Sequence, residues 1–119
     1  MEETTRLSAV LTDALLNSAA YLGITDTDLS LILGAGPVPI EEYRTGAAEI
    51  DPDSALGARA RDIVRVFTAL DTITAGDAGT RSQWLNHYNQ HLNGSPIELM
   101  RDPAGLARVA DYLDGNLHG

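Results

Sequence analysis

Two helix starts follow each other closely in the stretch Trp84–Leu113, whose sequence is WLNHYNQHLNGSPIELMRDPAGLARVADYL. In the first, Ser95 and Glu98 have the spacing of a capping box. The serine hydroxyl can accept from the backbone N–H of Glu98, and the carboxylate can reach back to the N–H of Ser95. Pro96 stands at the first helical position, where its missing N–H is no loss. The spacing therefore predicts a helix that begins at residue 96.

The second helix start lies at Asp102 and Pro103, which predict a capping side chain followed by proline at the first helical position. Apolar residues then recur at helical spacing, namely Leu106, Val109, Ala110 and Leu113. Because glycine commonly ends a helix, we expect Gly115 to stop this one and residues 116–119 to form a short tail.

The same stretch resembles the Xre/MbcA/ParS antitoxin family, in which a small toxin-binding domain is paired with a RES-domain toxin. The shared pattern is a Trp-Leu pair, an Asn, then Leu-x-Gly-x-Pro-x-Glu-Leu and Gly-x-x-x-Val-x-x-x-Leu. Its positions in this chain are Trp84, Leu85, Asn89, Leu92, Gly94, Pro96, Glu98, Leu99, Gly105, Val109 and Leu113. The ordered set carries the resemblance, which implies a toxin-binding domain that follows a helix-turn-helix unit.

Length and composition indicate one soluble domain. The chain has 119 residues, of which 44% are hydrophobic, enough for a single modest core. It contains no cysteine, and no apolar run approaches the length that spans a bilayer. The first residues are acidic where a signal peptide would be basic. We therefore expect a cytoplasmic protein without disulfides or a membrane segment.

The charge is unevenly distributed. The net charge is -9, and the chain has no lysine. Residues 1–53 contain two arginines against ten acidic residues, whereas residues 54–119 contain six arginines against seven. The acidic half should repel a polyanion such as DNA and attract a basic protein partner, although simple solubility is the alternative explanation.

Three helices are predicted in the N-terminal half, over residues 7–22, from a cap at Thr25 to a stop at Gly34, and over residues 39–45. This is the outline of a helix-turn-helix unit. We therefore divide one continuous all-α domain into two parts. Residues 1–50 form a degenerate helix-turn-helix-like region, and residues 51–119 form an Xre/MbcA/ParS-type toxin-binding region.

The candidate DNA-reading helix, residues 39–45, has an unsuitable composition. It offers Arg44 together with Glu41 and Glu42, and these carboxylates would face phosphates or base edges. Arg44 is the one candidate DNA contact. A helix-turn-helix repressor, acting alone or as a toxin complex, remains the alternative function, but we do not expect the N-terminal half to bind DNA by itself.

Residues 51–75 are predicted to form the longest helix and the spine of the fold. Asp51 and Pro52 should cap and open it. Its apolar stripe consists of Leu56, Ala60, Ile63, Val64, Phe67, Leu70 and Thr74. A helix over residues 78–88 should follow, with Trp84 and Leu85 directed inward, and then a loop to Gly94.

Enzymatic chemistry is poorly supported. The serines lack the glycine-flanked elbow that presents a nucleophile, and Gly34-Ala35-Gly36 follows a predicted helix instead of a strand. His87 and His91 have the spacing of two metal ligands on one helix face, but no third ligand accompanies them. We predict that the protein is not an enzyme and needs no cofactor or metal.

The C-terminal end offers the best candidate site. Asp111 and Asp114 lie near the end of the last helix, where the helix dipole disfavours negative charge, so something else could use these charges. The resemblance implies that this helix and the tail cover the NAD site of a RES-type toxin, an NAD glycohydrolase or ADP-ribosyltransferase. The contact residues it suggests are Arg108, Asp111, Tyr112, Asp114, Asn116, Leu117, His118 and Gly119.

The sequence thus predicts an all-α antitoxin of a type II toxin–antitoxin system that occludes its toxin partner. The resemblance and the general preference for symmetric oligomers also predict a homodimer. An immunity protein against a secreted effector of the same toxin fold is a further alternative.

Overall fold

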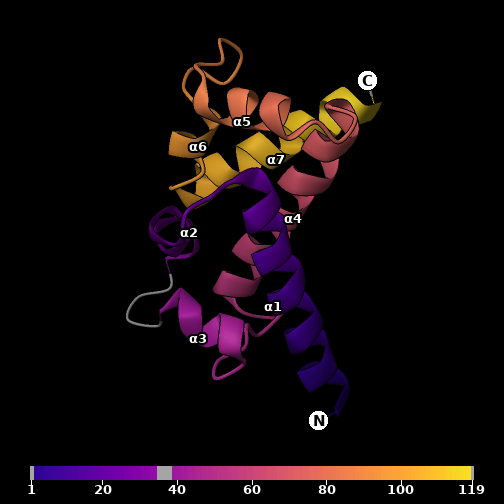
Figure 1. The fold of residues 1–119 in the computed structure, drawn as a ribbon, viewed down its shortest axis with the longest axis vertical. Helices are drawn as coiled ribbons and strands as arrows, with labels where there is room; N and C mark the ends of the chain where they lie inside the picture. The colour runs from indigo at the N-terminus through magenta and orange to yellow at the C-terminus, as the bar shows by residue number, and fades with distance from the viewer. Residues whose placement is uncertain (1, 35–38, 119) are drawn as a thin grey trace.

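The computed structural model describes residues 2–34 and 39–118, and these residues form seven α-helices (Figure 1). The helices are α1 (Glu2–Leu22), α2 (Asp26–Leu33), α3 (Ile40–Thr45), α4 (Ala55–Ile73), α5 (Ala78–Asn86), α6 (Pro96–Leu99) and α7 (Pro103–His118). The described part of the chain contains no strand, only an isolated bridge between Asn89 and Gly94. The prediction of an all-α fold is confirmed. None of the described helices is both long and apolar enough to cross a membrane.

Helix α4 is the spine of the fold, as predicted. It packs against α1 along one side and against α7 along another (Figure 1). Its fully buried side chains include Ile63, Val66 and Leu70, which recur at helical spacing on the side of α4 that faces the neighbouring helices. Val64 and Phe67, which the predicted stripe included, are only partly buried. Full burial of a side chain such as Leu70 stabilises the fold by about 1.5–3 kcal/mol. Because α4 buries several such side chains, its packing against α1 and α7 dominates the stability of the fold.

Helix α4 is not the longest helix, because α1 has 21 residues and α4 has 19. Helix α1 begins at Glu2 instead of residue 7. The acidic residues at its start are favourable at the positive end of the helix dipole.

The start of α4 corrects a second prediction. Ser54, not Asp51, is the N-cap, and its hydroxyl accepts a hydrogen bond of 2.9 Å from the backbone N–H of Gly57. The Asp51 carboxylate instead accepts from the backbone N–H of Asp53 at 2.9 Å, which closes a local turn before the helix. The carbonyl oxygens of Asp51 and Pro52 pass so close to Gly57 that a Cβ would not fit there.

The N-terminal helices follow the predicted pattern closely. The Thr25 hydroxyl accepts from the backbone N–H of Asp28 at 3.1 Å and caps α2, and Gly34 ends this helix in the left-handed conformation. Helix α3 buries Ile40 and Tyr43 and ends at Gly46, again as predicted. The other two residues of the predicted stop, Ala35 and Gly36, lie outside the described residues.

Helices α5 and α6 differ from prediction in two respects, although α6 begins at residue 96 as predicted. Helix α5 ends at Asn86, two residues early, and α6 is a single turn of four residues. The Ser95 side chain makes no capping hydrogen bond, so the predicted capping box does not form. In so short a helix the backbone carbonyl of Ser95 already accepts from Leu99, and few unpaired N–H groups remain for a cap to satisfy.

Candidate functional site

Helix α7 carries most of the predicted site residues and is held in place by its own cap and by its apolar stripe. The Asp102 carboxylate accepts from the backbone N–H of Gly105 at 3.2 Å, which confirms the predicted cap. All four predicted stripe residues, Leu106, Val109, Ala110 and Leu113, are buried. A Cβ at Gly105 would overlap the backbone oxygen of Leu99, so this glycine allows α6 to approach α7 closely. The exposed face of α7 therefore has a fixed orientation.

The end of α7 corrects a further prediction. The helix does not stop at Gly115 but continues to His118. Apart from the neighbouring turns of α7 itself, none of the described residues has an atom within 4 Å of where a Cβ at Gly115 would stand. Asn116 donates a hydrogen bond of 3.1 Å to the carbonyl of Tyr112 one turn earlier. Residues 114–118 thus extend the helix and do not form a separate tail.

Asp111 and Asp114 meet on one guanidinium. Arg65 of α4 donates to a carboxylate oxygen of Asp111 at 2.8 Å and to one of Asp114 at 2.6 and 3.2 Å. It also donates to Asp62, one turn earlier in α4, at 2.8 Å. The hydrogen bonds to Asp111 and Asp114 raise the pKa of the Arg65 guanidinium well above its usual value. We call Asp62, Arg65, Asp111 and Asp114 the acidic cluster.

Sequence reasoning missed Arg65, although a signal for it was present. Two carboxylates near the negative end of a helix are locally unfavourable and need a compensating cation. The cation comes from α4, 46 and 49 positions away along the chain. Only the packing of α4 against α7 identifies which arginine it is.

An aromatic stack forms the neighbouring surface of α7. The Tyr112 ring stacks with the Trp84 ring, at a centroid distance of 6.3 Å, and with the His91 ring, at 5.9 Å. The interplanar angles of 17° and 26° correspond to stacked rings. Trp84 is partly buried here, whereas Leu85, the other predicted anchor, is fully buried. The stack joins α5, the following loop and α7 into one surface.

The remaining predicted contacts lie around this surface. Arg108 is exposed, and its guanidinium is 3.5 Å from the carbonyl oxygen of His91. Asn116 is also exposed. Leu117 and His118 continue the backbone of α7, but their side chains, like all of Gly119, lie outside what the structure describes.

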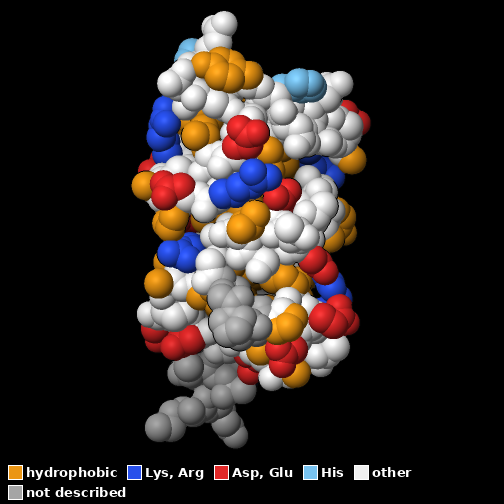
Figure 2. Space-filling model, turned by 90° about the vertical axis from the view of Figure 1, so that its left-hand side faces the viewer, with side chains coloured by type: hydrophobic (Ala, Val, Ile, Leu, Met, Phe, Trp, Pro, Cys, Tyr) orange, Lys and Arg blue, Asp and Glu red, His pale blue; other side chains and the backbone are white. Residues whose placement is uncertain are grey.

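The candidate DNA contact has protein partners. The Arg44 guanidinium donates to both carboxylate oxygens of Asp26, at 2.8 and 3.2 Å, and to Glu41 at 2.7 Å. Its hydrogen bonds lower the pKa of the Asp26 carboxyl. On the described part of the face over α2, arginines stand beside acidic side chains and form no continuous basic patch (Figure 2). This arrangement does not favour contact with a phosphate backbone.

The two histidines with metal-ligand spacing do not share a helix. Helix α5 ends at Asn86, so His87 and His91 belong to the loop. The His87 ring nitrogen lies 2.8 Å from the carbonyl oxygen of Gln83. Within residues 2–34 and 39–118 there is no group of three or more histidine, aspartate or glutamate side chains arranged to hold a metal ion.

The fold and the site define an all-helical protein whose C-terminal half presents an exposed, partly acidic helix face for a partner. Residues 69–119 match the family model described as the antitoxin Xre/MbcA/ParS C-terminal toxin-binding domain. This match supports the resemblance to the Xre/MbcA/ParS antitoxin family that the sequence indicated. The match begins in the second half of α4 and includes α5, α6 and α7. A comparison with curated proteins found no match.

Proposed function

We propose that this protein is an antitoxin that binds a RES-type, NAD-consuming toxin and occludes its NAD site with the C-terminal end of α7. The toxin-binding domain supports a toxin as the partner. The observation that carries the finer proposal is the acidic cluster, which holds Asp111 and Asp114 side by side near the end of the family-matched helix.

The charge of the cluster suits a nucleotide site. Asp62, Asp111 and Asp114 carry three negative charges against the single positive charge of Arg65. The acidic cluster as a whole therefore has a net negative charge. A cleft that binds the pyrophosphate of NAD needs basic groups, and these would attract the exposed carboxylate of Asp111, whose side chain is 73% exposed.

The aromatic stack supports the same surface in a different way. Tyr112 stacks with both Trp84 and His91, and these two contacts restrict its ring before a partner binds. A fixed side chain loses less conformational entropy on binding than a mobile one. In this proposal Tyr112 and the exposed Arg108 border the carboxylates and contact the toxin around its NAD site.

The test uses a purified RES-type toxin and measures its consumption of NAD at increasing antitoxin concentration. The double variant Asp111→Asn with Asp114→Asn should need about tenfold more antitoxin for half inhibition, the equivalent of about 1.4 kcal/mol. Truncation after Leu113 should also weaken inhibition while the core stripe, which ends there, keeps the protein folded. Unchanged inhibition by both variants would contradict occlusion by this end of the molecule.

Glu98→Gln is the matched control. Glu98 is an exposed acid on α6, within the family-matched region but on a different helix from Asp111 and Asp114. It should inhibit like the unmodified protein. If it weakened inhibition as much as the double variant, general negative charge and not the position of Asp111 and Asp114 would be responsible.

A further inference from the structure

An apolar groove runs between the first half of α1 and the first half of α4. Its volume is about 610 Å³, and its apolar lining consists of Leu7, Val10, Leu11, Ala14, Pro52 and Val64. Leu7 is 51% exposed and Val10 is 58% exposed. Both belong to a face of α1 that neither α3 nor α4 covers. Contiguous exposed apolar surface of this kind marks an interaction site.

The groove lies outside the region that the family match assigns to toxin binding. Its lining residues fall in residues 7–65, whereas the match covers residues 69–119. Arg65 also lines the groove and donates to Asp111 and Asp114 of α7, so one edge of the groove adjoins the acidic cluster.

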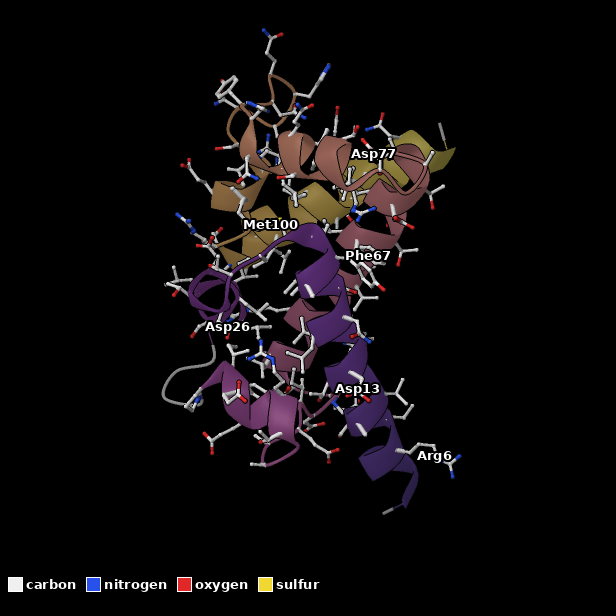
Figure 3. The ribbon with its side chains drawn as sticks, viewed as in Figure 1. Arg6, Asp13, Asp26, Phe67, Asp77 and Met100 are labelled. Atoms are coloured by element: carbon white, nitrogen blue, oxygen red, sulfur yellow. The ribbon has the colours of Figure 1, made fainter. Side chains whose placement is uncertain are left out.

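Two charged residues on α1 identify the occupant. Arg6 and Asp13 are exposed residues of α1 (Figure 3). They are seven positions or about two turns apart, so helical geometry places them on the same flank, and Val10 lies between them along the chain. When two identical helices pack antiparallel, equivalent flanks face each other. A second α1 centred on Val10 would then place each Arg6 beside the Asp13 of the other copy. A parallel pair brings opposite flanks together and gives neither contact.

We propose that the groove binds a second copy of this chain, with the two α1 helices antiparallel across a two-fold axis near Val10. Leu7 and Val10 of each copy enter the groove of the other, and two reciprocal Arg6–Asp13 ion pairs border the contact. The proposal extends the proposed function by giving the antitoxin a dimer interface centred on α1, a different helix from the one proposed to bind the toxin. The two ion pairs also offset part of the electrostatic repulsion between two chains that each carry a net charge of -9.

The first test is the oligomeric state of the full chain, measured by sedimentation equilibrium. The unmodified protein should dimerise, and Val10→Asp should raise the dissociation constant about tenfold or more because it places two carboxylates at the axis. Leu31→Asp is the control, since Leu31 is 54% exposed on α2, away from the groove. A monomeric unmodified protein, or equal effects of the two substitutions, would overturn the proposal.

The second test is a charge exchange that only the antiparallel arrangement can satisfy. Arg6→Asp and Asp13→Arg should each weaken the dimer, because each creates two like-charge pairs across the interface. The double variant restores both pairs with reversed polarity and should recover the dissociation constant of the unmodified protein. Additive weakening by the two substitutions would exclude this pairing.

The third test uses the absence of cysteine from the chain. Val10→Cys places one thiol on each copy beside the two-fold axis and should give a disulfide-linked dimer under mild oxidation. Leu31→Cys should remain monomeric on a non-reducing gel. Because none of these tests involves a toxin, their outcome is independent of the inhibition experiment. Failure of the interface and failure of toxin occlusion can therefore be told apart.

Discussion

Arg65 and Asp114 form the shortest ion pair of the acidic cluster, with 2.6 Å between a guanidinium nitrogen and a carboxylate oxygen. The residues are 49 positions apart, and the pair joins the middle of the spine helix to the last turns of α7. It therefore fixes the end of the proposed toxin-binding helix relative to the core. It also stabilises the Asp114 carboxylate near the C-terminal end of α7, where the helix dipole disfavours negative charge.

The coupling between Arg65 and Asp114 is measurable. Arg65→Gln and Asp114→Asn should each lower the free energy of unfolding by about 0.5–1 kcal/mol, a modest amount because both side chains are partly exposed. In urea denaturation the double variant should lose less than the sum of the two, with a coupling of about 0.5 kcal/mol or more. Strict additivity would mean that the pair contributes nothing to stability.

Gly105 and Gly115 should respond oppositely to alanine although both lie in α7. At Gly105 the new methyl group meets the backbone oxygen of Leu99, so α6 and α7 must separate at a cost of about 1–3 kcal/mol. At Gly115 the methyl group would meet no described atom outside its own helix within 4 Å, and alanine should stabilise the helix by about 0.5–1 kcal/mol. Thermal unfolding of the two variants provides the comparison. A destabilising Gly115→Ala would show that the chain does not continue as a helix there.

Trp84→Ala should destabilise the protein by about 3 kcal/mol, since it removes a partly buried ring and its stack on Tyr112. Tyr88→Ala is the matched control, because Tyr88 is 65% exposed and should cost about 0.5 kcal/mol or less. Trp84 is the only tryptophan, so its fluorescence also reports on the stack. A loss below 1 kcal/mol in urea denaturation would place Trp84 in an interface with another protein and not in this core.

Acid should destabilise the protein through two aspartates with lowered pKa. Hydrogen bonds from Thr80 lower the pKa of Asp77, the N-cap of α5, and those from Arg44 lower the pKa of Asp26. A lowered pKa in the folded state adds stability that is present above the unfolded pKa of about 3.9 and disappears as the pH falls through the folded value. The melting temperature should therefore fall below about pH 4, and less steeply for Asp77→Asn. An equal slope in the variant would exclude Asp77 as a contributor.

DNA binding by the isolated protein should be undetectable even at low salt. Arg44, the candidate contact, already pairs with Asp26 and Glu41, and the N-terminal half is strongly acidic. A gel shift with the promoter upstream of the coding region at low ionic strength checks this. A shift that Arg44→Ala abolishes would contradict it and would restore the repressor hypothesis.

The sequence predicted the helix ends that depend on a few neighbouring residues. Thr25 caps α2 and Asp102 caps α7 because each side chain needs only the backbone N–H three positions later. The apolar stripe of α7 was readable because burial follows a fixed helical period. The predictions of a capping box at Ser95 and of a helix end at Gly115 were wrong for a related reason. Serine permits a cap and glycine permits a helix end, but neither residue requires one.

By itself, then, the sequence determined an all-helical chain, most of its helix starts and a toxin-binding family pattern, since these follow from short-range hydrogen bonding and periodicity. The tertiary structure alone decided which cation meets Asp111 and Asp114, which rings stack on Tyr112 and which face of α1 stays uncovered. Those contacts join residues far apart in the chain. They depend on how α1, α4 and α7 pack together, and no local spacing of residues encodes that packing.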